Sequence, residues 1–424
     1  MSDTPKKRKS RQMLAHLSAA SSDVSVPCSV SVREVSSLPQ NYDIISEIEC
    51  QEDASNIVSV VSSLDEHYTQ SFSKRKQEIA ERFTPKKEKS LLLFESYKRL
   101  SQAHTERSEY YLSKASKVGQ CGEFLEFSHQ LVDGKLSNAR LHNANFCHDR
   151  LCPLCAWRRS LKIFGQVSRI MDIVAPDYKF VFLTLTVPSV PACELSLTVD
   201  RLQKSFDTLF KRKAVRQAVC GFFRCLEITY NHKKYSASFG LYHPHFHLIL
   251  AVPKNYADKG NPIYISQAQW LQMWRECYND ESIKFVDVRL VKPNVEKLRK
   301  KHTDEEISQM SDSQLMASTV AEVAKYTVKD SDYIISDDFK LTDDIVFALS
   351  DALHGRRLLG SGGCFKEAAR KLGLDDAESG DLVNLNETIN NDVQQLIVRY
   401  GWSCGCYKIV SLDLKSPCID VDAE

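Results

Sequence analysis

The sequence predicts an α+β fold, in which an antiparallel sheet with flanking helices follows a helical segment and a cysteine-rich module. Three observations support this prediction. Between residues 179 and 291, four short runs have the apolar or alternating pattern of strands. Two amphipathic stretches with helical spacing separate these runs. Residues 73–117 are rich in Lys, Glu, Ala, Leu and Arg, a composition that is typical of helices.

The predicted elements define a topology. In order, they are a strand at 179–188, a helix at 196–217, strands at 222–230 and 241–250, a helix opened by Ser266 and Gln269, and a strand at 283–291. Elements in this order pair as an antiparallel sheet with helices packed on it. We therefore expect a ferredoxin-like arrangement.

The rest of the chain divides by composition. Residues 1–73 are rich in serine and poor in hydrophobic periodicity, so we expect a disordered tail with a basic start. Residues 74–165 hold the helical segment, which Pro85 is expected to divide into two helices, and the cysteine-rich module. Residues 166–335 hold the predicted sheet. Residues 336–424 form a C-terminal region to which the sequence assigns no role.

The composition excludes some classes of protein. At 424 residues, with 43% hydrophobic and 26% charged residues, the chain is an ordinary globular protein of two or three domains. Its formal net charge of +1 indicates no particular partner. The start has no apolar signal sequence, and no apolar run is long enough for a bilayer. We expect a cytoplasmic protein with reduced thiols and no membrane partner.

Two histidines on one predicted strand form the first candidate site. His245 and His247 leave one face of the strand, and Phe246 and Leu248 leave the other. Imidazoles at positions i and i+2 can chelate one cation, while the apolar face fixes the strand in a core. A carboxylate on a neighbouring strand would complete the site, and Glu227 is placed for that role. The alternative is a half-buried strand with two solvated histidines.

A cysteine cluster precedes the predicted sheet. Cys152 and Cys155 form a Cys-x2-Cys knuckle, whose tight turn aims two thiolates at one ion. Cys147 is near enough to add a third ligand, and Cys121 can bring a fourth from the preceding segment. We predict structural Zn²⁺ on these four cysteines. Two histidines remain as rival ligands: His142 and His148.

Basic side chains in two places are candidates for binding a DNA backbone. Arg158 and Arg159 follow the cysteine knuckle directly. Lys211, Arg212 and Lys213 follow one another near the end of a predicted helix. For any one basic stretch, a solvated helix face is the commoner explanation.

An acid, a phenol and an amine share one face of a helix that is predicted to begin near residue 313. Glu322, Tyr326 and Lys329 fall at positions i, i+4 and i+7. Taken alone, they are an ordinary exposed face. A tyrosine oxygen can nevertheless attack a phosphodiester and keep the phosphoryl group as an ester. Tyr333 is an alternative nucleophile, although its acidic neighbours would resist a phenolate.

Three motifs stand in one order along the chain: Phe182-Leu183-Thr184-Leu185-Thr186, His245-Phe246-His247 and Tyr326-Thr327-Val328-Lys329. In this order they resemble the HUH endonucleases and, within them, the single-tyrosine initiators of rolling-circle plasmid replication. The cysteine cluster is also similar to that family, as are Gly355-Arg356-Arg357-Leu358 and Gly362-Gly363. The likeness covers roughly residues 118–370.

The resemblance implies a nicking reaction on plasmid origin DNA. Tyr326 would attack the nick site, keep the 5′ phosphate and free a 3′ hydroxyl that primes synthesis. Glu322 would activate the water that ends the cycle, and Lys329 would hold the phosphate or stabilise the phenolate. Mn²⁺ or Mg²⁺ on the two histidines and the glutamate would polarise the phosphate, although imidazoles also admit zinc or nickel. The DNA would be single-stranded or cruciform at the nick. A host helicase and polymerase are the implied protein partners.

Three other interpretations remain open. The spacing of His243, His245 and His247 also satisfies a histidine-triad nucleotide hydrolase, which needs no metal. A non-catalytic, zinc-dependent DNA-binding protein would use the histidines structurally. A transposase or relaxase of the HUH type would differ only in its DNA substrate.

Overall fold

The computed structural model describes residues 77–79, 81–132, 135–136, 139–292, 298–300, 302–324, 328–385 and 395–415, and all of them belong to one unit, Asp53–Glu424. The predicted tail at residues 1–73 lies outside the described residues.

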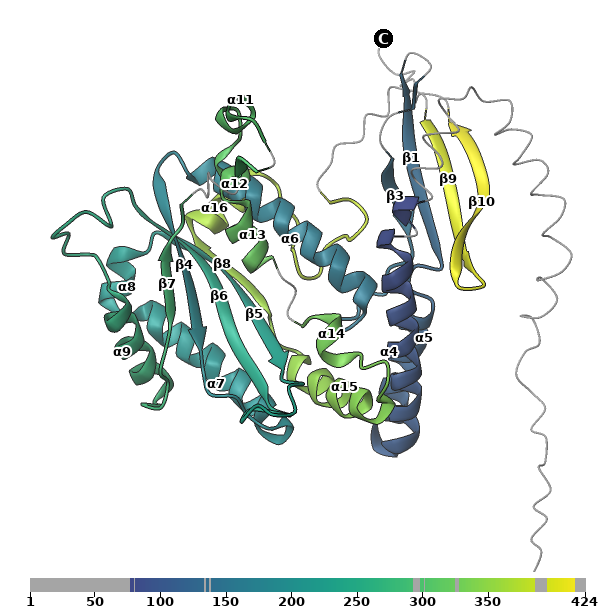
Figure 1. The fold of residues 1–424 in the computed structure, drawn as a ribbon, viewed down its shortest axis with the longest axis horizontal. Helices are drawn as coiled ribbons and strands as arrows, with labels where there is room; N and C mark the ends of the chain where they lie inside the picture. Colours follow the sequence, from purple (N-terminus) through teal and green to yellow (C-terminus); the bar gives the residue numbers. More distant parts are fainter. Residues whose placement is uncertain are drawn as a thin grey trace, which may run out of the picture. The chain divides into compact units, whose positions relative to one another are not determined.

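The histidine-bearing strand lies inside an antiparallel sheet (Figure 1). Within the described residues this sheet has five strands in the order β7-β4-β6-β5-β8, and every neighbouring pair is antiparallel. The first four strands along the chain are connected and ordered as in a ferredoxin-like fold, so this prediction is confirmed. The strands are β4 (Tyr178–Thr186), β5 (Gly221–Tyr230), β6 (Tyr242–Pro253), β7 (Asp287–Leu290) and β8 (Leu359–Gly363).

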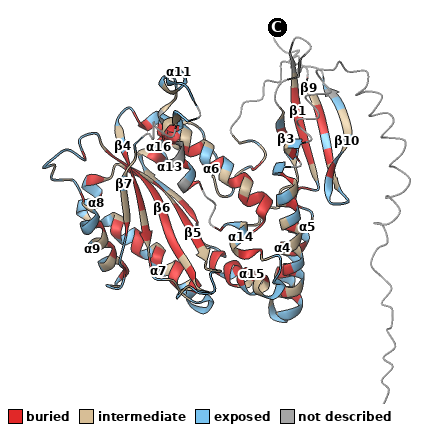
Figure 2. Cartoon of the chain, viewed as in Figure 1, coloured by how far each residue is buried: buried red, intermediate tan, exposed pale blue. Residues whose placement is uncertain are grey.

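Helices cover both faces of this sheet. Helices α7 (Ala192–Lys211) and α9 (Gln267–Tyr278) belong to one face, where Phe206 packs in the same core cluster as Leu248. Helix α6 (Pro153–Val174) belongs to the other, where Val167 shares a cluster with Ile249. Strand β6 is therefore buried along nearly its whole length (Figure 2). A strand packed on both sides is held rigidly, which suits a strand that carries metal ligands.

Further helices complete the same part of the chain. Those between and after the strands are α8 (Lys213–Ala218), α11 (Asp304–Ser308), α12 (Asp312–Leu315), α13 (Ala317–Val323), α14 (Asp330–Tyr333), α15 (Phe339–Leu353) and α16 (Cys364–Lys371). Helices α13 and α16 pack on the face of the sheet that α6 covers. No described helix has both the length and the apolar character of a membrane span.

A second antiparallel sheet pairs strands from residues 124–144 with strands from residues 395–415. Strands β1 (Phe124–Val132), β2 (Lys135–Leu136) and β3 (Arg140–Ala144) come from the region that was predicted to hold helices and the cysteine-rich module. Strand β1 pairs with β9 (Gln395–Ser403), which forms a hairpin with β10 (Cys406–Lys415). The C-terminal region, which had no predicted role, therefore packs with residues that precede the first sheet.

The N-terminal helices follow the predicted composition. Helix α4 (Thr84–Ala103) has Pro85 in its first turn, where a missing backbone N–H costs nothing, and helical residues 77–79 precede it. The predicted division at Pro85 is thus present. A short 3₁₀ turn, η1 (Thr105–Arg107), then leads to α5 (Ser108–Gly119), a second interruption that the sequence did not predict.

Candidate active site

The pairing of three strands brings an acid and two histidines to one face of the first sheet. Strand β6 pairs with β5 so that His245 lies opposite Glu227. It pairs with β4 so that His247 lies opposite Thr184. Directly opposed side chains point to the same face, and so do alternate residues of one strand. The structure thus brings together the three residues that the sequence proposed as metal ligands.

The ligand atoms of these residues converge. Oε2 of Glu227 lies 2.9 Å from Nε2 of His247 and 3.5 Å from Nε2 of His245. The two Nε2 atoms lie 3.1 Å apart. Glu227, His245 and His247 are only 3%, 7% and 8% exposed, respectively, so water screens their interactions weakly.

The second nitrogen of each ring indicates where the lone pairs point. Nδ1 of His245 lies 3.0 Å from the carbonyl oxygen of His243, which can only accept, so this Nδ1 carries the proton. Nδ1 of His247 lies 3.2 Å from Oγ1 of Thr184, which can accept from it. With both Nδ1 atoms protonated, two nitrogen lone pairs and a carboxylate would face one another in a buried space. They would repel one another unless a cation lay between them.

A divalent cation fits this donor set. Neighbouring ligands of octahedral Mg²⁺ lie about 3 Å apart, because each bond measures about 2.1 Å, and the three separations above are similar. Burial by itself raises the pKa of Glu227, but the neighbouring rings of His245 and His247 lower that pKa well below its usual value. The carboxylate is therefore charged, as a ligand must be. These three residues could hold a divalent metal ion.

His243 and Thr184 support the ligands, a role that the sequence did not reveal. The ring of His243 stacks on that of His245 at 4.9 Å, and its Nε2 bonds to the hydroxyl of Thr186. Burial and the neighbouring His245 lower the pKa of His243 to about 4, so this ring is neutral at pH 7. Outer partners of this kind orient the rings that bind a metal.

Lys329 reaches the same carboxylate from a different element. Its Nζ lies 3.2 Å from Oε1 of Glu227, the oxygen opposite the one that faces the histidines. The prediction that Lys329 continues the helix of Glu322 is wrong. Helix α13 ends at Val323, and Lys329 has extended backbone angles (φ −75°, ψ 137°) as the N-cap of α14. Lys329 reaches the metal ligands from this extended position.

The two other predicted catalytic residues, Glu322 and Tyr326, lie wholly or partly outside the described structure. Tyr326 lies outside the described residues, between Ala324 and Val328. Glu322 lies in the last turn of α13, and its side chain is also outside the described part of the structure. The alternative nucleophile Tyr333 is fully buried, and its hydroxyl donates to the carbonyl of Leu151. The phenol of Tyr333 is therefore engaged beside the cysteine cluster.

Four cysteine thiols form a second group of candidate ligands. The Sγ atom of Cys121 lies 3.5 Å from those of Cys152 and Cys155, and the Sγ atoms of Cys147 and Cys155 are 3.6 Å apart. Thiolates on one tetrahedral Zn²⁺ lie about 3.8 Å apart, because a Zn–S bond measures about 2.3 Å. Cys152 is the N-cap of α6 and Cys155 lies in its first turn, where the helix dipole favours thiolates. These four residues could hold zinc, and the rival histidines do not join the group.

We expect Cys155→Ser to lower both the zinc content and the stability of the protein. A serine hydroxyl is a poor ligand for zinc, and structural zinc contributes directly to the free energy of folding. Metal analysis should find about one zinc ion fewer per chain, and thermal unfolding should shift to lower temperature. Cys193→Ser is the matched control, because Cys193 is exposed and outside the cluster. Equal zinc in both variants would contradict the assignment.

Comparison with known proteins identifies the family of this chain. A family model described as replication protein matches residues 138–407, more than half of the chain. The chain belongs to the replication protein family. This confirms the resemblance to plasmid replication initiators that the motifs indicated.

Individual members of the replication protein family are similar over most of their length. A Protein rep of Bacillus amyloliquefaciens is 39% identical over 307 residues, covering 71% of this chain and 85% of the relative. A Protein rep of a Bacillus species is 38% identical over 313 residues, covering 72% and 95%. A Protein rep of Streptococcus pneumoniae is 35% identical over 270 residues, covering 63% and 74%. No solved structure matches.

Two arginines that were predicted to bind DNA lie inside this replication protein. Arg158 donates to the carbonyl oxygens of Leu382 and Val383, and Arg159 donates to those of Glu378 and His148. The two residues are only 7% and 1% exposed, respectively. The prediction that they contact DNA at the surface is therefore wrong. Both guanidinium groups instead hold a C-terminal segment, residues 378–383, against α6.

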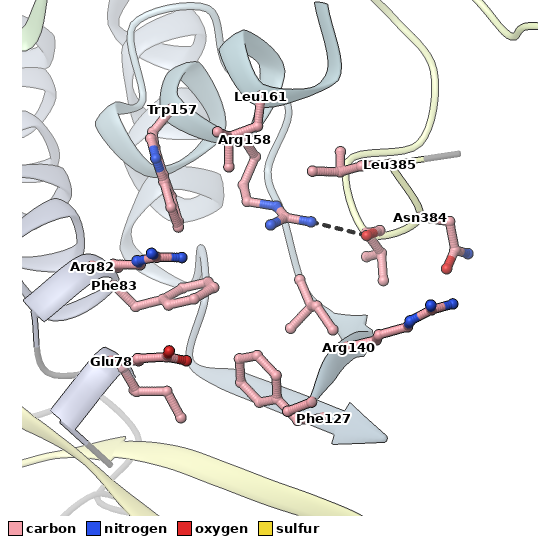
Figure 3. A pocket seen from close by; sticks show the side chains of 14 residues that line it. Glu78, Arg82, Phe83, Phe127, Arg140, Trp157, Arg158, Leu161, Asn384 and Leu385 are labelled. Atoms are coloured by element: carbon pink, nitrogen blue, oxygen red, sulfur yellow. Dashed lines mark hydrogen bonds between the residues drawn. The ribbon is translucent and has the colours of Figure 1, made fainter. Parts of the chain in front are cut away.

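The surroundings of Arg158 form a cavity of about 250 Å³. Figure 3 shows the guanidinium group of Arg158 beside Trp157 and Phe83, with one bond to the C-terminal segment. Arg82 and Arg140 lie at other sides of the same cavity. The positive charge of this region thus comes from three separate parts of the chain, at Arg82, Arg140 and Arg158.

The remaining DNA-binding candidates are at the surface. Lys211 ends α7 and Lys213 begins α8, and both are exposed. Arg212, between them, is half-buried and lies 2.5 Å from a carboxylate oxygen of Glu276. The two lysines are thus accessible to a phosphate backbone, whereas Arg212 is already paired.

Proposed function

We propose that this replication protein initiates plasmid replication by nicking one strand of origin DNA through a tyrosine ester. The observation that supports the proposal is the convergence of Glu227, His245 and His247 with the ammonium group of Lys329. Such a group suits phosphoryl transfer, in which charge develops on the oxygens around phosphorus. The family membership makes DNA the expected substrate.

The proposed step exchanges one ester for another. Oη of Tyr326 attacks the phosphorus of the scissile phosphodiester and loses its proton. The bond from phosphorus to the 3′ oxygen breaks, and that oxygen takes up a proton to become the free 3′ hydroxyl. The 5′ phosphate stays on the tyrosine, so the energy of the broken bond is conserved for the later joining step.

Each supporting residue has a role that its chemistry allows. Mn²⁺ or Mg²⁺ on the three ligands would supply Lewis-acid stabilisation of a phosphate oxygen. Glu227 and the two imidazoles would hold the divalent ion in a buried place. The ammonium group of Lys329, which contacts Glu227, would stabilise the phenolate or a phosphate oxygen beside this site. In the closing half of the cycle, Glu322 orients the attacking water.

Origin DNA is the proposed partner and would be single-stranded, or extruded as a cruciform, at the nick. A sheet-borne site cannot easily reach a backbone inside a stacked duplex. Lys211 and Lys213 are accessible candidates for contacts with phosphates. A host helicase and polymerase would act on the strand and the primer that the nick provides.

The proposal is tested with a labelled single-stranded origin oligonucleotide and Mn²⁺. A denaturing gel should show a shortened product and a protein-linked label, and peptide mapping should place the label on Tyr326. EDTA should prevent both. A histidine-triad hydrolase would keep its activity in EDTA, and a purely DNA-binding protein would shift the oligonucleotide without cleaving it. Either result would refute the proposal.

We expect Glu322→Ala to nick but to accumulate the covalent adduct. The first attack uses the tyrosine, whereas release needs an oriented water, and a general base of this kind contributes about 100- to 10,000-fold. The ratio of adduct to free product, followed over time on a denaturing gel, measures the effect. Glu322→Gln, which keeps the size of the side chain, serves as a second variant. Release at the wild-type rate in both variants would exclude this role.

A further inference from the structure

Asp330, the residue after Lys329, lies between two lysines of helix α4. Nζ of Lys86 is 2.5 Å from one oxygen of its carboxylate, and Nζ of Lys89 is 3.0 Å from the other. Positions i and i+3 of a helix share a face, so both ammonium groups point the same way. Figure 1 shows α14 close to α4, as these ion pairs require.

These ion pairs are shielded on the side of the acid. The side chain of Asp330 is 13% exposed, compared with 30% and 38% for the two lysines. Burial by itself raises the pKa of Asp330, but hydrogen bonds and charge interactions with Lys86 and Lys89 lower that pKa below its usual value. The carboxylate is thus charged at neutral pH. A carboxylate that binds two cations is a firmer anchor than an isolated exposed pair.

The segment that contains Asp330 is held at further points. Val328 is buried in the core, and Lys329 reaches Glu227 of the metal-ligand group. At the other end of α14, Tyr333 donates to the carbonyl of Leu151. Asp330 therefore fixes the backbone next to Lys329 while Tyr333 fixes the following turn.

The adjoining face of α4 is fixed to the cysteine module. Nζ of Lys87 lies 2.8 Å from the carbonyl oxygens of both Gly119 and Cys121, and Lys87 is only 1% exposed. Oγ of Ser90 lies 3.4 Å from Sγ of Cys152. One stretch of α4 thus contacts the cysteine cluster through Lys87 and Ser90 and contacts α14 through Lys86 and Lys89.

We propose that Lys86 and Lys89 are positioning residues of the nicking reaction. Through Asp330 they set the backbone from which Lys329 reaches Glu227, and so they hold the ammonium group of Lys329 beside the metal-ligand group. This inference rests on the proposed function. Helix α4 precedes residues 138–407, the stretch that matches the family model, so it adds a support from outside that match.

We expect loss of the ion pairs between Asp330 and the two lysines to lower the rate of covalent joining and to leave DNA binding unchanged. Neither lysine is a ligand of the metal group, and both are engaged with Asp330. A displacement of about 1 Å at a reacting group can lower a rate about 100-fold. Loss of the anchor should therefore slow covalent joining while the protein still binds the oligonucleotide.

The test compares Asp330→Asn and the double variant Lys86→Met/Lys89→Met with Asp343→Asn. Asp343 is a matched control, because its carboxylate accepts from Ser96 and Arg99 of the same helix, and its side chain is 18% exposed. It belongs to α15, and its side chain makes no hydrogen bond or ion pair with Lys329 or Asp330 in the described part of the structure. The single-turnover rate of joining, the affinity for the oligonucleotide and the binding of Mn²⁺ without DNA are measured for each variant. Asp330→Glu, which keeps the charge, tests rescue.

We expect joining to fall about 10- to 100-fold in Asp330→Asn and in the double variant, with oligonucleotide and Mn²⁺ affinity within about twofold of wild type. Asp330→Glu should recover part of the rate, and Asp343→Asn should keep the wild-type rate. Wild-type joining in Asp330→Asn, or an equal loss in Asp343→Asn, would overturn the inference.

Amide hydrogen exchange separates this inference from the proposed function. Residues 328–333 should exchange faster in Asp330→Asn than in Asp343→Asn, because local opening costs less free energy once the anchor is lost. Unchanged exchange would overturn the positioning role even if the wild-type protein joined DNA. A wild-type protein that formed no adduct would instead overturn the proposed function, while faster exchange in Asp330→Asn would still support the anchor.

Discussion

The Tyr326→Phe variant should form no covalent adduct with a single-stranded origin oligonucleotide. The change removes one oxygen atom, and that oxygen is the proposed nucleophile. Loss of a nucleophile costs at least about 10,000-fold in other enzymes that form covalent intermediates. The phenyl ring is kept, so packing should change little. The adduct is measured on a denaturing gel, and DNA affinity and thermal unfolding should stay close to wild type.

Tyr333→Phe is the informative comparison for this prediction. The hydroxyl of Tyr333 donates to the carbonyl of Leu151, and its loss should cost about 1 kcal/mol of unfolding free energy. The variant should still form an adduct, because the phenol of Tyr333 is fully buried and its hydroxyl is bonded to Leu151. The opposite pattern, with adduct in Tyr326→Phe and none in Tyr333→Phe, would transfer the nucleophile to Tyr333.

The sequence predicted the metal-ligand group because local periodicity sets the direction of side chains in a strand. His245 and His247 are separated by one residue, and any strand therefore puts them on one face. Glu227 was found in the same way, from its position in a neighbouring strand. The order of strands and helices restricted the sheet to one topology, in which those two strands are neighbours.

Other features depend on partners far along the chain and were missed for that reason. Arg158 and Arg159 look like surface residues beside the cysteines, but the segment around residues 378–383 covers them. The second sheet pairs β1 with β9 across more than 200 residues, and no local pattern specifies such a pairing. The prediction of a helix that continues through Lys329 was wrong, because tertiary contacts hold this residue in an extended conformation.

Contacts of helix α4 connect the two candidate metal groups. Lys87 and Ser90 of α4 meet the cysteine module, while Lys86 and Lys89 hold Asp330 beside the proposed catalytic lysine. A zinc ion on the cysteines would stabilise the module on which α4 rests. Its contribution to the reaction would then be indirect, through the position of Lys329. A direct contribution would come from an ion on the histidines.

We therefore expect His247→Ala to lose both Mn²⁺ binding and covalent joining. Changes to residues that merely orient metal ligands cost about 10- to 100-fold in affinity, so loss of a ligand should cost more than about 100-fold. Glu227→Gln should behave similarly, because it keeps the shape of the side chain but removes the charge that balances the ion. Calorimetric titration with Mn²⁺ measures the affinity, and the denaturing gel measures joining.

His354→Gln is the control for this experiment, because His354 is exposed at the C-cap of α15 and lies outside the metal-ligand group. This variant should bind Mn²⁺ and join DNA as the wild type does. Zinc content separates the two metal groups, since His247→Ala should keep the zinc of the cysteine cluster and lose only the second ion. Joining at the wild-type rate in His247→Ala would show that the reaction does not need this ion. The histidines would then be structural, and Lys329 would have to stabilise the developing charge alone.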